Sequence, residues 1–227
     1  MICDVDGVLL DSPHERAWRE ALVGLADPKS FTTAIYQAYV AGKPRQDGAL
    51  AALEQFGVAD APRRAADYAR RKQARLEALI AQGAVKAYPD ALPFVLAVRA
   101  LGVPLSAASS SKNANAMMRL IPVSPGVSLL DLFEGNVCGR DLRHGKPDPE
   151  LFLLAASELG LKPAQCLVVE DAPAGVEAAL AGGMRALGVA RFHDAALLRA
   201  AGAELVVTGL DEVALADLGG GRLRAVG

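Results

Sequence analysis

The sequence has few cysteines and no strong excess of charge of either sign. Only three of its 227 residues are cysteines, Cys3, Cys138 and Cys166, and no two of them are close in sequence. An odd number of widely spaced cysteines argues against a disulfide framework, so we expect free thiols. The 24 basic and 26 acidic residues are too evenly balanced to indicate nucleic acid or an anionic membrane surface as a partner. A small-molecule substrate is therefore favoured.

Long apolar runs are also missing from the sequence. No stretch of about 18 or more apolar residues occurs, and the first residues lack a basic segment followed by a long apolar one. These absences argue against a membrane span and an export signal, so we expect a cytoplasmic protein. A chain of 227 residues can bury a full core in one large domain or two smaller ones. We expect a monomer or a weak dimer.

Short apolar runs typical of β-strands recur along most of the chain, and helical patterns separate them. The expected strands cover residues 1–3, 103–108, 136–138, 166–169, 185–189 and 204–207. The expected helices between them cover residues 90–100, 149–159 and 174–181. Each helical pattern begins near a Pro, Asp or Gly, as helix starts commonly do. This alternation predicts an α/β fold with a mostly parallel sheet.

One long interval, residues 12–82, interrupts this alternation. It contains four helical patterns and no convincing strand, and the patterns cover residues 14–24, 31–40, 46–56 and 62–81. An insertion directly after the first strand lies over the carboxyl end of the sheet, where open α/β proteins bind their ligands, so it is placed to act as a lid. We therefore predict a core domain of residues 1–11 and 83–227 and a helical cap domain of residues 12–82.

The first group suited to catalysis is a pair of aspartates, Asp4 and Asp6, between the first apolar segment and Gly7. Two carboxylates this close repel each other unless a cation or a shared proton lies between them. One carboxylate can attack phosphorus to form an aspartyl-phosphate, and the other can protonate the leaving oxygen. The alternative is that the pair only caps the turn at Gly7.

Three later segments also place phosphate-binding or metal-binding groups at the end of an expected strand or the start of an expected helix. Hydroxyls and free amides in Ser109–Asn113 suit an anion, although serines also cap helices. Lys146, fixed between a glycine and a proline, can neutralise an acid and a phosphoryl group, although it can also be a solvated surface lysine. Glu170 and Asp171 end an apolar strand, and Asp171, which can also cap a helix, could join Asp4 in supplying the oxygen ligands that Mg²⁺ prefers.

In order and context, these four segments resemble the motifs of the haloacid dehalogenase-like superfamily. The resemblance implies a Rossmann-like core, an inserted helical cap and phosphoryl transfer that depends on Mg²⁺. It also implies that Asp4 is the nucleophile and that Asp6 is the general acid and base, a pairing typical of phosphoryl transfer rather than dehalogenation. Ser109 and Lys146 complete the implied catalytic set. The implied metal ligands are Asp4, Asp6 through its backbone carbonyl, Glu170 and Asp171.

Within that superfamily the chain most closely resembles the β-phosphoglucomutase-like subgroup. Ser109-x-Ser111-Lys112-Asn113 is similar to the motif that holds a second, non-reacting phosphate. Gly42-Lys43-Pro44-Arg45 is similar to the cap loop that supplies an arginine, which can grip that phosphate bidentately. The residues that the resemblance places on the substrate are His14, Trp18, Gly42, Arg45, Lys72, Ser110, Ser111, Lys112 and Asn113.

These residues leave more than one function open. A phosphatase and a β-phosphoglucomutase would both act on a small phosphorylated sugar, and they differ in whether water or a sugar hydroxyl attacks the aspartyl-phosphate. The spacer between Asp11 and His14 is shorter than expected for a mutase, so we expect His14 to reach the site less readily, which favours the phosphatase. A non-catalytic sensor of a phosphorylated metabolite is the third alternative, but it would not need Asp6 beside Asp4.

Overall fold

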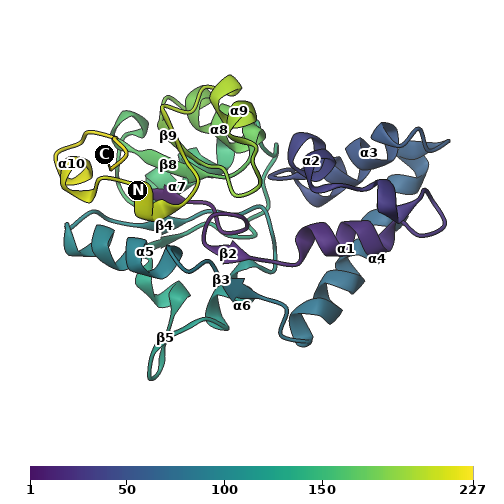
Figure 1. The fold of residues 1–227 in the computed structure, drawn as a ribbon, viewed down its shortest axis with the longest axis horizontal. Coiled ribbons are helices and arrows are strands. Elements are labelled where there is room, and N and C mark those ends of the chain that lie inside the picture. The colour runs from purple at the N-terminus through teal and green to yellow at the C-terminus, as the bar shows by residue number, and fades with distance from the viewer. Residues whose placement is uncertain (227) are drawn as a thin grey trace.

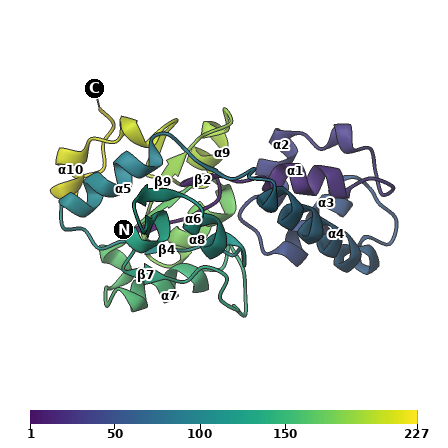
Figure 2. The same cartoon turned by 90° about the horizontal axis from the view of Figure 1, so that it is seen from below.

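The computed structural model describes residues 1–226 and contains a parallel sheet flanked by helices, with a separate group of helices beside it (Figures 1 and 2). Six parallel strands lie in the order β10-β9-β8-β1-β4-β7. They are β1 (Ile2–Cys3), β4 (Ser106–Ala107), β7 (Gly135–Asn136), β8 (Leu167–Glu170), β9 (Arg185–Val189) and β10 (Leu205–Val207). Each strand lies in or overlaps an apolar run predicted as a strand, so the parallel α/β fold is confirmed.

Helices cover both faces of this sheet. They are α5 (Ala91–Ala100), α6 (Ala114–Arg119), α7 (Glu150–Glu158), α8 (Pro173–Ala181), α9 (Ala195–Ala200) and α10 (Leu215–Gly219). Successive side chains of a strand point to opposite faces, so each buried strand contributes to two apolar layers. Ile2 and Val168 belong to the layer with α7 and α8, whereas Cys3 and Val169 belong to the layer with α5 and α6. The three cysteines are buried free thiols, as expected.

Two short antiparallel pairs were not predicted. β2 (Leu10–Asp11) pairs with β3 (Lys86–Ala87), and β5 (Pro122–Ser124) pairs with β6 (Val127–Ser128). Strands of two or three residues are too short to show a clear alternation of apolar and polar side chains. The β2–β3 pair brings together the two points at which the chain leaves and re-enters the core. No helix within residues 1–226 has the length and the apolar character needed to cross a membrane.

The inserted segment forms a group of helices that lies to the right of the core in both views (Figures 1 and 2). These helices are α1 (His14–Ala21), α2 (Thr33–Ile35), α3 (Arg45–Gln55) and α4 (Ala61–Ala81). They have their own apolar core, in which the rings of Trp18 and Tyr68 lie 5.1 Å apart between centroids and the Tyr68 hydroxyl donates to the Trp18 carbonyl at 2.9 Å. The helix expected over residues 31–40 is instead a short α-helix that continues as a π-helix, Tyr36–Val40.

Candidate active site

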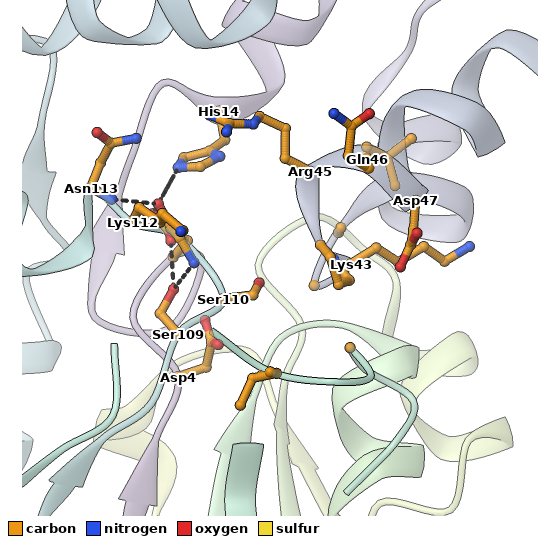
Figure 3. A pocket seen from close by; sticks show the side chains of 18 of the residues that line it. Asp4, His14, Lys43, Arg45, Gln46, Asp47, Ser109, Ser110, Lys112 and Asn113 are labelled. Carbon is orange, nitrogen blue, oxygen red and sulfur yellow. Dashed lines mark hydrogen bonds and ion pairs between the residues drawn. The ribbon is translucent and has the colours of Figure 1, made fainter. Parts of the chain in front are cut away.

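The four segments singled out in the sequence meet in one cavity of about 330 Å³ between the core and the cap (Figure 3). Asp4 follows β1, Ser109 follows β4 and Asp171 follows β8, so all three lie at the carboxyl ends of neighbouring parallel strands. Cap residues line the opposite side of the cavity, among them Lys43 and Arg45. The remaining predicted residues that line it are Asp6, His14, Trp18, Gly42, Lys72, Ser110, Ser111, Lys112 and Asn113.

Lys146 links two buried carboxylates beneath this cavity. Its ammonium donates to Asp4 Oδ1 at 2.6 Å and also to Glu170 Oε1, and the lysine side chain is only 1% exposed. Burial alone would lower the pKa of Lys146, but attraction to the Asp4 and Glu170 carboxylates outweighs that effect and raises it. Lys146 is therefore a permanent cation that fixes the position of the Asp4 carboxylate.

Glu170 uses both of its carboxylate oxygens within the protein. Besides the contact with Lys146, Oε2 accepts hydrogen bonds from the backbone amides of Asp171 at 3.0 Å and Ala172 at 3.1 Å. A Cβ at Gly175 would lie 2.0 Å from the Glu170 carboxylate, so the glycine is needed for this close approach. These contacts favour a role for Glu170 in holding Lys146 and the start of α8, rather than direct contact with a cation.

Asp4 and Asp171 form the part of the site that suits a cation. Burial raises the pKa of both carboxyls; for Asp171 the neighbouring Glu170 and Asp4 charges add to the rise, and for Asp4 the Lys146 charge opposes it. Gly7, with φ +86°, gives Asp171 its space, because a Cβ there would lie 1.9 Å from Asp171 Oδ2. A divalent cation would offset the repulsion between these carboxylates.

The number of protein ligands also suits Mg²⁺, which usually takes one or two carboxylates and completes its shell with phosphate and water. Within residues 1–226, no cluster of three or more Asp, Glu, His or Cys side chains forms a closed metal site. A cation at Asp4 and Asp171 would therefore need further oxygen atoms from the substrate, from water or from the main chain. A site in which two carboxylates leave the other coordination positions open fits Mg²⁺, the predicted cofactor.

Asp6 lies beside Asp4 and keeps one carboxylate oxygen free. Ser109 Oγ donates to Asp6 Oδ2 at 3.3 Å, and Asp6 Oδ1 is buried without a hydrogen-bonding partner, although His14 Nε2 lies 3.5 Å from it. Burial, together with the Lys72 charge, lowers the pKa of His14 to about 4, so the imidazole is neutral at neutral pH. The distance between His14 and Asp6 shows that His14 reaches the site although the spacer before it is short, contrary to our expectation.

Lys72 reaches the same region from α4. Its ammonium lies 2.9 Å from His14 Nδ1 and 4.8 Å from the centroid of the Trp18 ring, and the residue is 3% exposed. Burial lowers the pKa of Lys72 to about 7; Asp6 opposes this shift and Arg45 adds to it. Lys72, His14 and Trp18 thus form one largely buried group at the cap side of the cavity.

The residues expected to hold a second phosphate line the same cavity. Ser111 Oγ accepts from the Asn113 amide at 3.3 Å, and the Asn113 side chain exchanges hydrogen bonds of 3.3 and 3.4 Å with Gln73 of the cap. Lys112 forms an exposed ion pair of 2.6 Å with Asp141. Gln73 was not predicted, because a glutamine on a charged helix carries no distinctive signal in the sequence.

The cap loop that carries Arg45 packs directly against the core. The Pro44 ring fills the space beside Gly145, where a Cβ would fall 1.8 Å from Pro44 Cγ. At Gly42, with φ +74°, a Cβ would lie 3.2 Å from the Ala172 side chain. Arg45 begins α3 and is exposed at the cavity. The loop therefore brings a cation to the substrate side of the cavity and closes over the Lys146 segment.

Arg191, which the sequence did not single out, supports the loop after Asp6. It donates to the carbonyls of Gly7 at 3.4 Å and Val8 at 3.0 Å, and it forms two hydrogen bonds of 2.7 and 3.0 Å with Asp90. Its guanidinium carbon lies 4.1 Å from the centroid of the Tyr88 ring. Arg191 follows β9 at the carboxyl end of the sheet. This position just after a predicted strand is the one feature of the sequence that could have identified Arg191 as part of the site.

Comparisons with known proteins agree with this geometry. The sequence model of one family, described as haloacid dehalogenase-like hydrolase, matches residues 1–183. The chain belongs to this family. It is therefore an enzyme of the phosphatase and phosphomutase type, and the sensor alternative is set aside.

Individual relatives are named for both activities. The chain is 32% identical over 240 residues to a β-phosphoglucomutase of Mycobacterium bovis, covering 92% of this chain and 89% of the relative. It is 33% identical over 192 residues to hexitol phosphatase A of Escherichia coli, covering 82% and 80%. A crystal structure of an archaeal β-phosphoglucomutase from a Pyrococcus species matches with a TM-score of 0.75 and 30% identity, covering 96% of this chain and 95% of that one.

Proposed function

We propose that this enzyme is a Mg²⁺-dependent phosphatase that acts on a small phosphorylated sugar through an aspartyl-phosphate at Asp4. The observation that carries the proposal is the arrangement at the cavity floor. Lys146 holds the Asp4 carboxylate, and beside it Asp6 keeps one oxygen free of protein partners. The names of the relatives, which include a hexitol phosphatase and a β-phosphoglucomutase, support a sugar phosphate as the substrate class.

The proposed reaction divides one displacement into two steps. The Asp4 carboxylate attacks phosphorus, the bond from phosphorus to the sugar oxygen breaks, and Asp6 gives that oxygen its proton. Asp6 then accepts a proton from water as the water attacks the aspartyl-phosphate, which releases inorganic phosphate and restores Asp4. When bound at Asp4 and Asp171, Mg²⁺ supplies positive charge against the phosphoryl oxygens.

Other residues position the substrate in this proposal. Ser109 holds Asp6 and lies at the start of the segment that offers hydroxyls and amides to phosphate. Arg45, Ser111, Lys112 and Asn113 line the cavity and would hold the far end of the substrate or a second phosphate. Lys112 would exchange its exposed partner Asp141 for that anion at little cost, because exposed ion pairs contribute only about 0–1 kcal/mol.

β-Phosphoglucomutase activity is the second candidate, and one observation specifically favours it. His14 lies within 3.5 Å of Asp6 and is held by Lys72, so a group that could orient a sugar hydroxyl is present despite the short spacer. The two activities share the first step and differ in the acceptor of the phosphoryl group. Water gives the phosphatase, and a sugar hydroxyl held under the cap gives the mutase.

One incubation separates the two candidates. The protein is mixed with Mg²⁺, β-glucose 1-phosphate and a trace of glucose 1,6-bisphosphate, and both glucose 6-phosphate and free phosphate are measured. Free phosphate without glucose 6-phosphate supports the phosphatase, and glucose 6-phosphate without free phosphate supports the mutase. A panel of other sugar phosphates then identifies the preferred substrate.

A single substitution tests the nucleophile common to both candidates. Asp4→Asn is expected to abolish turnover and to prevent trapping of the enzyme by fluoroberyllate, which mimics an aspartyl-phosphate. Asp171→Asn is expected to raise the Mg²⁺ concentration needed for half-maximal activity. Unchanged phosphate release by Asp4→Asn would show that Asp4 is not the nucleophile.

A further inference from the structure

A second cavity, of about 310 Å³, reaches the catalytic carboxylates from another direction. It shares Asp6, Tyr36 and Asp171 with the substrate cavity. Its other walls come from β2 and the segment after it, from α1, from Gln37 of the π-helix, and from core residues that include Tyr88 and Phe192. Its acidic lining residues are Asp6, Asp11, Glu15 and Asp171.

The charge of this second cavity differs from that of the substrate cavity. Its two basic residues both have acidic partners: Arg19 pairs with Glu15 and donates to a backbone carbonyl, and Arg16 pairs with Glu20 at 2.7 Å. The substrate cavity, by contrast, has basic lining residues suited to phosphate. They are Lys43, Arg45, Lys72, Lys112, Arg140 and Arg143. The second cavity is therefore suited to a cation and its water rather than to an anion.

Gln37 is the unusual residue of the second cavity. It is only 3% exposed, it lines the cavity, and neither its amide nitrogen nor its amide oxygen has a hydrogen-bonding partner. Buried polar groups in native proteins are almost always paired, and an exception commonly indicates an unseen water, ion or ligand. Gln37 also belongs to a π-helix, a feature that occurs frequently at functional sites.

Gln37 faces the Asp171 side of the site. Both side chains line the second cavity, and both residues are buried. Gln37 comes from the cap, whereas Asp171 comes from the core, so the two approach each other only when the cap packs on the core, as the Pro44 contact with Gly145 shows it does here. A neutral amide can donate to one water and accept from another without adding charge.

We propose that the Gln37 side-chain amide hydrogen-bonds the water shell of the cation held at Asp171 and thereby links closure of the cap to cation binding. This inference rests on the proposed cation site at Asp4 and Asp171. It assigns Gln37 as a positioning residue that acts through water, and it assigns the second cavity as the space that holds this water. Residues in such outer shells commonly change metal affinity by about 10-fold to 100-fold.

The test measures binding of Mg²⁺ alone by isothermal titration calorimetry, without substrate. Gln37→Leu removes both hydrogen-bonding groups and is expected to weaken Mg²⁺ binding by about 10-fold. Gln37→Glu keeps an acceptor and adds a negative charge, so it is expected to bind Mg²⁺ at least as tightly as the parent. Gln55→Leu makes the same exchange at an exposed residue at the end of α3 that lines neither cavity, and it is expected to leave Mg²⁺ binding unchanged.

Stability in the absence of Mg²⁺ separates this role from a purely structural one. Because leucine removes an unpaired buried amide, Gln37→Leu is expected to unfold at an equal or higher temperature than the parent without the metal, while gaining less stability when Mg²⁺ is added. A structural role alone would lower the stability of the metal-free protein and leave the gain from Mg²⁺ intact. That result would overturn the inference.

The outcomes also distinguish this inference from the proposed cation site. If Asp171→Asn loses Mg²⁺ binding while Gln37→Leu binds within twofold of the parent, the site stands and the role of Gln37 is wrong. If the parent itself binds no Mg²⁺, both proposals fail. Weaker binding in Gln37→Leu, with Gln37→Glu and Gln55→Leu at or above the affinity of the parent, supports the inference.

Discussion

Lys72→Met should make the protein more stable at neutral pH, although it removes a residue of the site. Burial lowers the pKa of Lys72 to about 7 from an ordinary value of 10.5. At pH 7 Lys72 is therefore partly deprotonated in the folded protein but protonated in the unfolded chain. This difference lowers the free energy of unfolding by about 4 kcal/mol. Methionine retains most of the packing, and the lost hydrogen bond to His14 subtracts about 1 kcal/mol. The expected net gain is about 3 kcal/mol.

The pH dependence of this gain follows from the direction of the pKa shift. Between pH 7 and 10.5 the unfolded parent binds more protons than the folded parent at Lys72, so the contribution of this residue to stability rises with pH. The advantage of Lys72→Met should therefore fall by about 1.4 kcal/mol for each pH unit and disappear near pH ~9.5. Urea unfolding of both proteins at several pH values from 7 to 9.5 measures this difference directly.

Lys29→Met is the matched control, since Lys29 is an exposed cap lysine. It should change the free energy of unfolding by no more than about 0.5 kcal/mol at every pH. A Lys72→Met protein that is less stable than the parent, or whose advantage does not change with pH, would refute the reasoning that Lys72 is a buried and largely uncompensated cation. Activity gives a separate measurement, because loss of the Lys72 charge should raise KM for an anionic substrate.

Three further predictions concern the core. Gly7→Ala should lower turnover and weaken Mg²⁺ binding at least about 10-fold, because the new Cβ would overlap Asp171; normal calorimetric binding of Mg²⁺ would contradict this. Arg191→Met should lower kcat with little change in KM, and Arg191→Lys should recover part of the loss, whereas a change confined to KM would argue against a positioning role. Burial raises the pKa of Cys3 and Cys138 to about 12, so neither thiol should react with a disulfide reagent at pH 8 until urea unfolds the chain. Rapid labelling of the native protein would contradict the burial of these thiols.

The core could be predicted because its information is local in the sequence. At two of the central strands a short apolar run leads directly into acidic residues, as in Cys3-Asp4 and Val169-Glu170-Asp171. Parallel strands necessarily bring their carboxyl ends to one edge. The lengths of the strands could not be predicted in this way, because an apolar run such as residues 103–108 forms a strand only over Ser106–Ala107. Pairing depends on the neighbouring strand, which the run itself does not specify.

The cap residues could not be predicted in the same way, because their positions depend on packing between segments far apart in sequence. Spacer length predicts that His14 falls short of the site, but α1 begins at His14 itself, soon after β2 pairs with β3, and His14 reaches Asp6. Gln37 carries no signal at all, since a glutamine in a helical segment is ordinary until its partners are known.

In the proposed function the cap does more than cover the site, because it lines two cavities of different charge. In the proposed function, cap cations such as Arg45 meet phosphate on one side of Asp6 and Asp171, whereas Gln37 meets the acidic side with a neutral amide. A cation in place of Gln37 would compete with Mg²⁺ for Asp171, and a purely apolar side chain would leave the water shell of the metal unpaired. Gln37→Lys is accordingly expected to lose Mg²⁺ affinity more severely than Gln37→Leu in the same calorimetric titration. The reverse order would mean that the amide of Gln37 does not face the cation.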